Sequence, residues 1–169
     1  VFISMENAYP LSHDPSLLRH YYRAGLRMLS LVHGSHNDFA DSSGITADAV
    51  GEHGGLTEKG RQMIAEANRL GIIIDHSHAS PQVFDQMIEL STAPIILSHS
   101  GAAAIFEHPR NIDDARLKKL AENGGVISVN SLAGYLIDIG ATPEYRAEVG
   151  EVYRALGGRK DLTAEQRRQ

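Results

Sequence analysis

The stretch Ile72-Ile-Ile-Asp-His-Ser-His78 decides the fold, because an apolar, β-branched run leads directly into polar residues that suit metal binding. Runs of this kind are typical of parallel strands that are buried on both faces. The same pattern recurs along the chain. Apolar runs lead into Glu6 and His33, and Ile95-Ile-Leu-Ser98 leads into His99. One carboxylate and three imidazoles therefore follow successive predicted strands.

Helix-like segments separate the predicted strands. Thr57 is a good N-cap, apolar residues repeat after it at helical spacing, and Gly71 ends the pattern. We predict strands at residues 2–5, 28–32, 72–74, 95–97 and 126–129, and helices at residues 15–24, 58–70, 81–88, 112–123 and 142–157. Strands that alternate with helices in this way indicate an α/β protein with a parallel sheet.

The polar residues at the strand ends favour a barrel over a doubly wound sheet. A doubly wound sheet gathers its ligands at one switch point, whereas here a polar residue follows nearly every predicted strand. In a (β/α)8 TIM-type barrel, the carboxyl ends of all strands face one shared mouth. A full barrel has eight strands and about 250 residues, and about five β/α units are visible here. We therefore expect residues 1–169 to be a single domain, the central and incomplete part of a metal-dependent hydrolase barrel.

Composition narrows the classes of ligand. The chain has 169 residues, a net charge of −5 and no long basic run, so a nucleic-acid partner is not expected. It has no cysteine, so any metal must be held by histidine or carboxylate side chains. No apolar stretch approaches the roughly 20 residues of a membrane span. The compartment stays undetermined, because a soluble protein of the cytoplasm, the periplasm or the extracellular space fits this composition equally.

The ends of the chain bear on its assembly. Residue 1 already lies in an apolar run, and the polar stretch Arg159–Gln169 adds no final core element, so the chain reads like an interior piece of something longer. An incomplete barrel exposes two strand edges, which invite pairing with another chain. We therefore expect either association, for example into a homo-oligomer, or further segments that cover these edges.

Six blocks of sequence, in this order and spacing, point to one family. They are Leu29-Ser-Leu-Val-His33 with Asn37 and Ala40-Asp41, Gly55-Leu-Thr-Glu-Lys-Gly60, Asn68-Arg-Leu-Gly71 with Ile74-Asp75-His-Ser-His78-Ala-Ser80, Ala93-Pro-Ile-Ile-Leu-Ser-His99-Ser100, His108-Pro-Arg-Asn-Ile112, and Ala121-Glu-Asn-Gly-Gly-Val126. Over roughly residues 1–135 the chain resembles the zinc-dependent membrane (renal-type) dipeptidases and their bacterial relatives.

The resemblance implies a two-zinc barrel hydrolase that cleaves the amide bond of dipeptides by a metal-bound hydroxide. It implies that Glu6 bridges both metals, and that His78 and His99 complete the protein ligands of one of them. It gives His33 a catalytic and substrate-binding role near the scissile carbonyl. It also implies that Arg110 pairs with the negatively charged end of the substrate, which suits the planar, charge-assisted recognition of carboxylates by arginine.

Three departures from the family keep other functions open. The family's His-x-Asp pair would lie before residue 1, so the second metal keeps only Glu6, and an acidic residue of a late strand would lie beyond residue 169. Asn7-Ala-Tyr9 follows Glu6 where the family usually has glycine. One alternative is a non-catalytic member that serves as a binding or assembly module. Another is a related metal-dependent amide hydrolase with a different small substrate.

Two of the site residues also have simpler interpretations. His33 is about as consistent with loop packing as with a substrate role. Arg110 is also suited to an ordinary salt bridge with Asp113 or Asp114. The connection from Gly34 to Gly55, which follows His33, is longer than most connections and favours a functional loop.

The remaining polar residues near the strand ends are expected to support the site. Asp75 is placed to orient a ligand imidazole, and His76 is expected to be structural or to support a metal ligand from behind. His36 is expected at the surface. A Ser/His/Asp triad built on Ser98 or Ser100 is disfavoured, because the chain lacks the Gly-x-Ser-x-Gly elbow of such enzymes.

Overall fold

A computed structural model describes residues 1–12, 14–44 and 51–140, together with positions 142, 144, 147, 148 and 151. The chain divides into two compact units, Val1–Leu136 and Ile137–Gln169. In the second unit, positions 144, 147, 148 and 151 are helical, and most of the helix predicted at 142–157 lies outside the described residues. All predicted site residues lie in the first unit, to which the following description applies.

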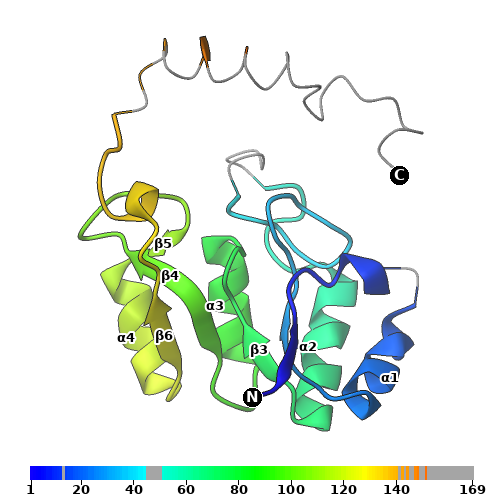
Figure 1. The fold of residues 1–169 in the computed structure, drawn as a ribbon. Coiled ribbons are helices and arrows are strands. Elements are labelled where there is room, and N and C mark those ends of the chain that lie inside the picture. The colour runs from blue at the N-terminus through cyan, green and yellow to red at the C-terminus, as the bar shows by residue number, and fades with distance from the viewer. Residues whose placement is uncertain are drawn as a thin grey trace. The chain divides into compact units, whose positions relative to one another are not determined.

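The first unit is built on a parallel sheet whose main strands follow one another in chain order. β1 pairs with β2, β2 with β3, β3 with β4, and β4 with β6. A short β5 pairs with the carboxyl end of β4. The strands are β1 (Ile3–Met5), β2 (Leu26–Ser30), β3 (Ile73–Asp75), β4 (Ile96–Ala102), β5 (Asn111–Ile112) and β6 (Val126–Val129). This is the order of consecutive strands in a barrel, and the sheet is curved (Figure 1).

Helices cover the outer side of this sheet. Within the described residues of this unit, α1 packs against α2, α2 against α3, and α3 against α4, so the helices form one layer (Figure 1). They are α1 (Leu18–Arg23), α2 (Glu58–Leu70), α3 (Pro81–Leu90) and α4 (Asp114–Glu122), with short 3-10 segments η1 (Tyr9–Leu11), η2 (Pro15–Leu17) and η3 (Ala133–Tyr135). The predicted α/β architecture with a parallel sheet is confirmed. None of the helices described has the length and apolar character that crossing a bilayer requires.

Both predicted ends of α2 are confirmed. The Thr57 hydroxyl accepts a hydrogen bond from the Gly60 N–H at 3.1 Å and so satisfies a backbone donor of the first turn. Gly71 adopts a left-handed conformation with φ 74°, and its N–H returns to the carbonyl of Ala67. Glycine adopts this left-handed conformation at little cost in free energy, because it has no Cβ to clash.

Several predicted boundaries are wrong. β2 ends at Ser30 and not at residue 32, and α1 begins only at Leu18. Two further errors, both around β5, have one cause. β4 continues to Ala102, so His99 lies within the strand and not beyond its end. It continues because β5 pairs with residues 101 and 102 and prolongs the ladder. For the same reason Ile112 belongs to β5, and α4 begins only at Asp114, behind the N-cap Asp113.

The core lies between the sheet and the helices. Leu29, Ile74 and Leu97 from the strands are buried together with Ile64 and Phe84 from α2 and α3. This packing joins each helix to the strand beside it. It therefore fixes where the carboxyl ends of the strands lie, which is the end of the unit that carries the candidate site.

The two outer strands expose apolar side chains. Phe2 and Ile3 lie at β1, Val126 and Val129 belong to β6, and Val129 keeps 74% of its surface exposed. Among the described residues, β1 pairs only with β2 and β6 only with β4. Both edges are therefore available to a further strand.

We predict that this chain associates in solution, because strand edges that carry exposed apolar residues template further pairing. Size-exclusion chromatography with light scattering should give a mass above that of the monomer. Val129→Lys should lower the associated fraction, because a charge at an edge opposes pairing. Leu90→Lys, at an exposed position of α3 away from both edges, serves as the matched control and should leave it unchanged. A sharp monomeric peak for the unaltered chain would contradict the prediction.

Candidate metal centre

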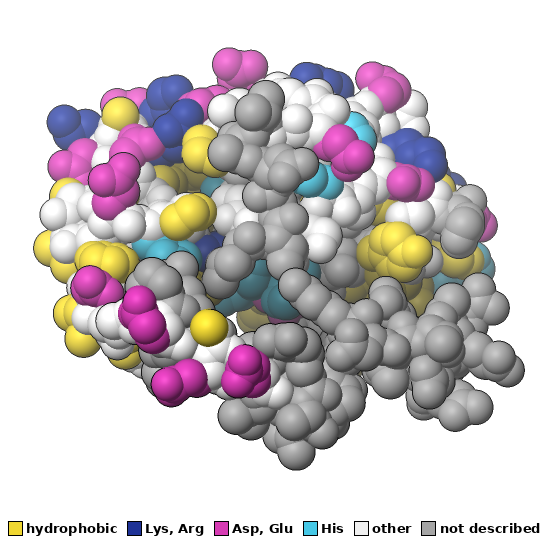
Figure 2. Space-filling model, turned by 90° about the horizontal axis from the view of Figure 1, so that it is seen from above, with side chains coloured by type: hydrophobic (Ala, Val, Ile, Leu, Met, Phe, Trp, Pro, Cys, Tyr) yellow, Lys and Arg dark blue, Asp and Glu magenta, His cyan; other side chains and the backbone are white. Residues whose placement is uncertain are grey.

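The four predicted strand-end residues meet at the carboxyl end of the sheet. Glu6 directly follows β1, His33 lies three residues beyond β2, His78 lies three residues beyond β3, and His99 is inside β4. Figure 2 looks onto this end, where histidine side chains come to the surface. The structure thus brings together residues that are far apart in the sequence.

Glu6, His78 and His99 form the tightest cluster. Glu6 Oε1 lies 3.1 Å from His78 Nε2 and 3.3 Å from His99 Nε2. The two Nε2 atoms are 2.8 Å apart. Ligand atoms about 2.0–2.1 Å from a tetrahedral zinc ion lie roughly 3.3 Å from one another. The three atoms are therefore spaced closely enough to share one cation.

His33 lies beside this cluster and not within it. Its ring centroid is 4.2 Å from that of His78, with the planes tilted by 42°. The ligand atoms of Glu6, His33 and His78 lie within 4.8 Å of one another, so a second candidate ligand set includes His33 in place of His99. The shorter distances favour the set with His99. His33 is exposed, which places it between the cluster and solvent.

The environment of His78 keeps its imidazole neutral. Burial lowers the pKa of His78 to about 3, and the nearby Arg110, His33 and His99 add to this effect. A histidine must be deprotonated to bind a metal, so no proton has to be removed from this side chain at neutral pH.

Two residues next to the cluster adopt left-handed backbone conformations that side chains disfavour. His78 has φ 76° and Asn7 has φ 71°. The carbonyl of His78 is held by the N–H of Ser43 at 2.8 Å. Asn7 tolerates this conformation better than most residues, and its Oδ1 accepts from Asn37 Nδ2 at 3.0 Å. The local loop shape is therefore available without glycine.

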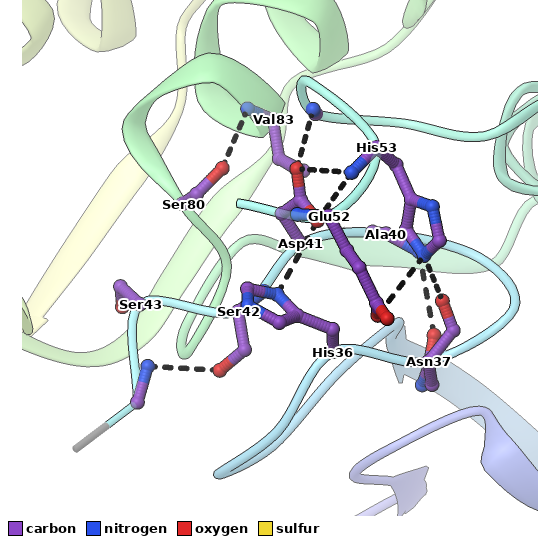
Figure 3. A network of polar contacts seen from close by, with 12 residues as sticks. His36, Asn37, Ala40, Asp41, Ser42, Ser43, Glu52, His53, Ser80 and Val83 are labelled. Carbon is purple, nitrogen blue, oxygen red and sulfur yellow. Dashed lines mark hydrogen bonds and ion pairs between the residues drawn. The ribbon is translucent and has the colours of Figure 1, made fainter. Parts of the chain in front are cut away.

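A buried carboxylate organises the long loop after His33 (Figure 3). Asp41 accepts hydrogen bonds from the backbone N–H groups of Glu52 at 2.8 Å, His53 at 3.0 Å and Gly55 at 2.7 Å. Burial pushes the pKa of Asp41 upward, but these three bonds outweigh it, and the pKa lies below its usual range. The side chain is therefore a charged anchor for the loop at neutral pH.

Ser42, the neighbour of Asp41, ties the loop to two site histidines. Its hydroxyl approaches the carbonyl oxygens of both His33 and His78, the latter at 3.1 Å. Its backbone forms an antiparallel bridge with Ala79. The loop thus fixes the backbone of His33 relative to that of His78. These contacts tie the loop to the backbone at the candidate site, and its functional role stays a prediction.

The prediction that His36 lies at the surface is wrong. Its side chain is only 11% exposed, and its Nδ1 lies 3.3 Å from Asp41 Oδ1 (Figure 3). The signal that was missed is the carboxylate five residues later. His76 is buried, and its Nε2 lies 3.1 Å from the carbonyl oxygen of Ser80, which is compatible with both interpretations of this residue.

Arg110 is a buried cation at the edge of the cluster. Its Nη2 donates to the carbonyl of His99 at 3.1 Å, and its Nε has no hydrogen-bond partner. Burial lowers the pKa of Arg110, whereas Tyr135, Asp75 and Glu6 raise it. The guanidinium therefore lies within electrostatic reach of the site residues.

The simpler interpretation of Arg110 does not hold among the described residues. Neither Asp113 nor Asp114 lies within ion-pair distance of Arg110. Asp113 instead pairs with Arg116 and caps α4. The positive charge of Arg110 is thus left without a carboxylate partner in the described parts of the chain.

Comparison with known proteins decides the family. The family model described as membrane dipeptidase (peptidase family M19) matches residues 1–165. The chain belongs to this family. The resemblance carried by the six sequence blocks is confirmed, and with it the expectation of a metallopeptidase-type hydrolase fold.

Curated relatives agree with this family. The dipeptidase verJ of Clonostachys rogersoniana is 38% identical over 127 residues, which make up 75% of this chain and 32% of the relative. An uncharacterised dipeptidase of Schizosaccharomyces pombe is 36% identical over 134 residues, which make up 79% of this chain and 32% of the relative. The chain therefore spans about a third of the length of these relatives.

Solved structures agree as well. The probable dipeptidase PvdM from Pseudomonas aeruginosa matches with a TM-score of 0.76 and 35% identity over 90% of this chain and 38% of that protein. A metallo peptidase from Rhodobacter sphaeroides, liganded with a phosphinate mimic of the dipeptide L-Ala-D-Ala, matches with a TM-score of 0.73 and 29% identity over 92% of this chain and 46% of that protein. The predicted barrel-type α/β fold is confirmed by these similarities.

We predict that Asp41→Ala destabilises the protein by about 3 kcal/mol, because several backbone N–H groups lose a charged acceptor in a buried position. Urea denaturation should show this as a lower free energy of unfolding. Asp38→Ala is the matched control, because Asp38 lies in the same loop, is exposed and pairs with the exposed Lys59. It should cost no more than about 0.5 kcal/mol. Equal losses for the two variants would contradict the anchoring role of Asp41.

Proposed function

We propose that this chain carries the metal-binding core of a zinc-dependent dipeptidase, an enzyme that hydrolyses the amide bond of dipeptides. The observation that carries the proposal is the convergence of Glu6, His78 and His99 within 3.3 Å of one another. Two further findings support it. The relatives named above are dipeptidases, and a similar solved metallo peptidase holds a mimic of a dipeptide.

The donor atoms suit zinc. Two neutral imidazoles and a carboxylate are borderline donors of the kind that catalytic zinc sites use, and they leave coordination positions open. Both histidine contacts of Glu6 are made by its Oε1. Glu6 would therefore have a second carboxylate oxygen to offer to a second cation, in keeping with the bridging role that the family resemblance implies.

The site residues are proposed to have different roles in metal binding and in substrate activation. A bound divalent cation supplies Lewis-acid chemistry, which polarises a carbonyl and favours ionisation of water. Glu6, His78 and His99 would hold this cation at the mouth. His33, exposed and adjacent to His78, is placed to contact the scissile amide and is the proposed catalytic histidine of this chain.

Arg110 gives the proposed site its preference for short peptides. Its charge lacks a carboxylate partner among the described residues, and its Nε has no hydrogen-bond partner. Pairing with the free carboxylate of a dipeptide would supply that partner close to the metal ligands. A longer peptide would place its terminal carboxylate too far from the scissile bond.

We predict that hydrolysis of a simple dipeptide depends on zinc and on His99. Chelation should abolish turnover and added zinc should restore it, because the cation supplies the Lewis acid. His99→Ala should lower kcat/KM by more than about 100-fold through loss of a metal ligand. His20→Ala, a change at an exposed position of α1, is the matched control and should stay close to the unaltered enzyme. Absence of turnover by the zinc-loaded protein would contradict the proposal and would favour a non-catalytic binding module.

We predict that Arg110 accounts for discrimination between a dipeptide and the same dipeptide with an amidated C-terminus. The unaltered enzyme should prefer the free carboxylate, and Arg110→Ala should remove this preference mainly by raising KM for the dipeptide, by roughly 10- to 100-fold. Arg110→Lys should retain part of it. Arg116→Ala, which removes the ion pairs of Arg116 with Asp85 and Asp113, is the control. If Arg110→Ala kept the preference intact, a related amide hydrolase with an uncharged substrate would be the better assignment.

A further inference from the structure

A serine and a buried aspartate lie behind His99, on the side away from Glu6. Ser98 Oγ is 2.8 Å from His99 Nδ1 and 2.5 Å from Asp75 Oδ2. His99 Nε2, the other ring nitrogen, faces Glu6 and His78. The chain of contacts therefore runs from Asp75 through Ser98 to His99, and from there into the candidate metal site.

The direction of these hydrogen bonds follows from their chemistry. An ionised carboxylate can only accept hydrogen bonds, so the Ser98 hydroxyl donates a hydrogen bond to Asp75. The hydroxyl oxygen then has only lone pairs to offer to His99, and it must accept from an Nδ1–H group. A neutral imidazole with its proton on Nδ1 has a free lone pair on Nε2. That lone pair points toward the position where a cation would be held.

We call the contacts from Asp75 through Ser98 to His99 the relay. Backbone hydrogen bonds fix it at both ends. Asp75 Oδ1 accepts from the N–H groups of Ser77 at 2.9 Å and of Ser98 at 3.0 Å. The N–H of His99 donates to Ser77 Oγ at 3.0 Å. Asp75 also pairs directly with Ile96 in the register between β3 and β4. The carboxylate is thus held in one orientation by backbone donors from two neighbouring strands.

A cation beside His99 would add to the charge balance of Asp75. The side chain is 3% exposed, and among the described residues no lysine, arginine or histidine nitrogen lies within ion-pair distance of it, although Arg110 interacts with its charge from farther away. A buried carboxylate without a close counter-charge is costly. A cation bound at His99 Nε2 would supply that charge through the relay, and the carboxylate would in turn make the imidazole a stronger donor.

We propose that Asp75 and Ser98 are positioning residues for His99, which hold its imidazole in the Nδ1–H tautomer so that Nε2 can bind the metal. The inference rests on the metal centre of the proposed function. It also excludes the serine-nucleophile alternative at Ser98. In a Ser/His/Asp triad the imidazole lies between serine and carboxylate, whereas here the serine lies between the carboxylate and the imidazole.

The tautomer of His99 is the direct test, and it can be read in the metal-free protein by NMR of 15N-labelled histidine, with His99→Gln to assign the signal. The unaltered protein should show His99 protonated on Nδ1. In Asp75→Asn the new amide NH₂ donates to Ser98, so the hydroxyl turns toward His99 and the proton of the imidazole moves to Nε2. In Ser98→Ala, His99 should no longer prefer the Nδ1–H tautomer. In Ser98→Thr, which keeps the hydroxyl on a residue suited to a strand, His99 should keep that preference.

Zinc affinity, measured by competition with a chromophoric chelator, is the second readout. Ser98→Ala and Asp75→Asn should weaken binding by roughly 10- to 100-fold, as is typical for residues that support a metal ligand. Ser98→Thr should stay within about threefold of the unaltered protein. Ser91→Ala is the matched control, because the Ser91 hydroxyl bonds, within the described part of the chain, only to Asn68 and Ala93, at the opposite end of the sheet.

The outcomes separate the relay from the proposed function. An Nε2–H tautomer of His99 in the unaltered protein would overturn the relay. Zinc affinity of Ser98→Ala equal to that of Ser91→Ala would overturn it as well. If the unaltered protein bound no zinc, the proposed function would fail, and the tautomer measurement would still decide the relay by itself.

Discussion

Curvature of the sheet is the constraint on which the candidate site depends. β1 and β4 are separated by β2 and β3. Because neighbouring strands lie about 4.8 Å apart, a flat sheet would hold the backbones of β1 and β4 roughly 14 Å from each other. Glu6 Oε1 nevertheless lies 3.3 Å from His99 Nε2. A sheet that curls around its own axis, with the helices packed on its outer side, brings both side chains over one mouth (Figure 1).

Other residues around the site stabilise the backbone conformations that the metal-binding arrangement needs. His78 and Asn7 adopt left-handed conformations that cost about 1–3 kcal/mol each. Hydrogen bonds from the long loop stabilise the carbonyl of His78, and the loop itself is organised by the buried Asp41 (Figure 3). Behind His99, Asp75 performs a similar anchoring task within the sheet. Two buried carboxylates, Asp41 and Asp75, thus support the site without being proposed ligands.

Much of this arrangement could be predicted from residue patterns. Apolar runs located the main strands, and the cap at Thr57 with the stop at Gly71 located α2. Because the carboxyl ends of parallel strands face one mouth, the sequence predicts that Glu6 and His99 lie close together. Those predictions rest on local periodicity and on one topological rule, which is why they could be made from sequence.

The missed features depend on contacts between distant segments. β5 has two residues and no periodicity of its own, and it exists because β4 offers it an edge. His36 is buried because Asp41 folds back onto it. Ser98 meets Asp75 only through the register of β3 and β4. The sequence shows that a carboxylate follows His36 by five residues, but it does not show that any of these contacts form.

The most direct test of the account is anomalous diffraction at the zinc absorption edge from crystals grown with zinc. We expect an anomalous peak within about 2 Å of Glu6 Oε1, His78 Nε2 and His99 Nε2. A peak coordinated by Glu6, His33 and His78 with His99 left free would contradict the proposed ligand set. A crystal with no anomalous density at the mouth of the strands would contradict the metal centre itself.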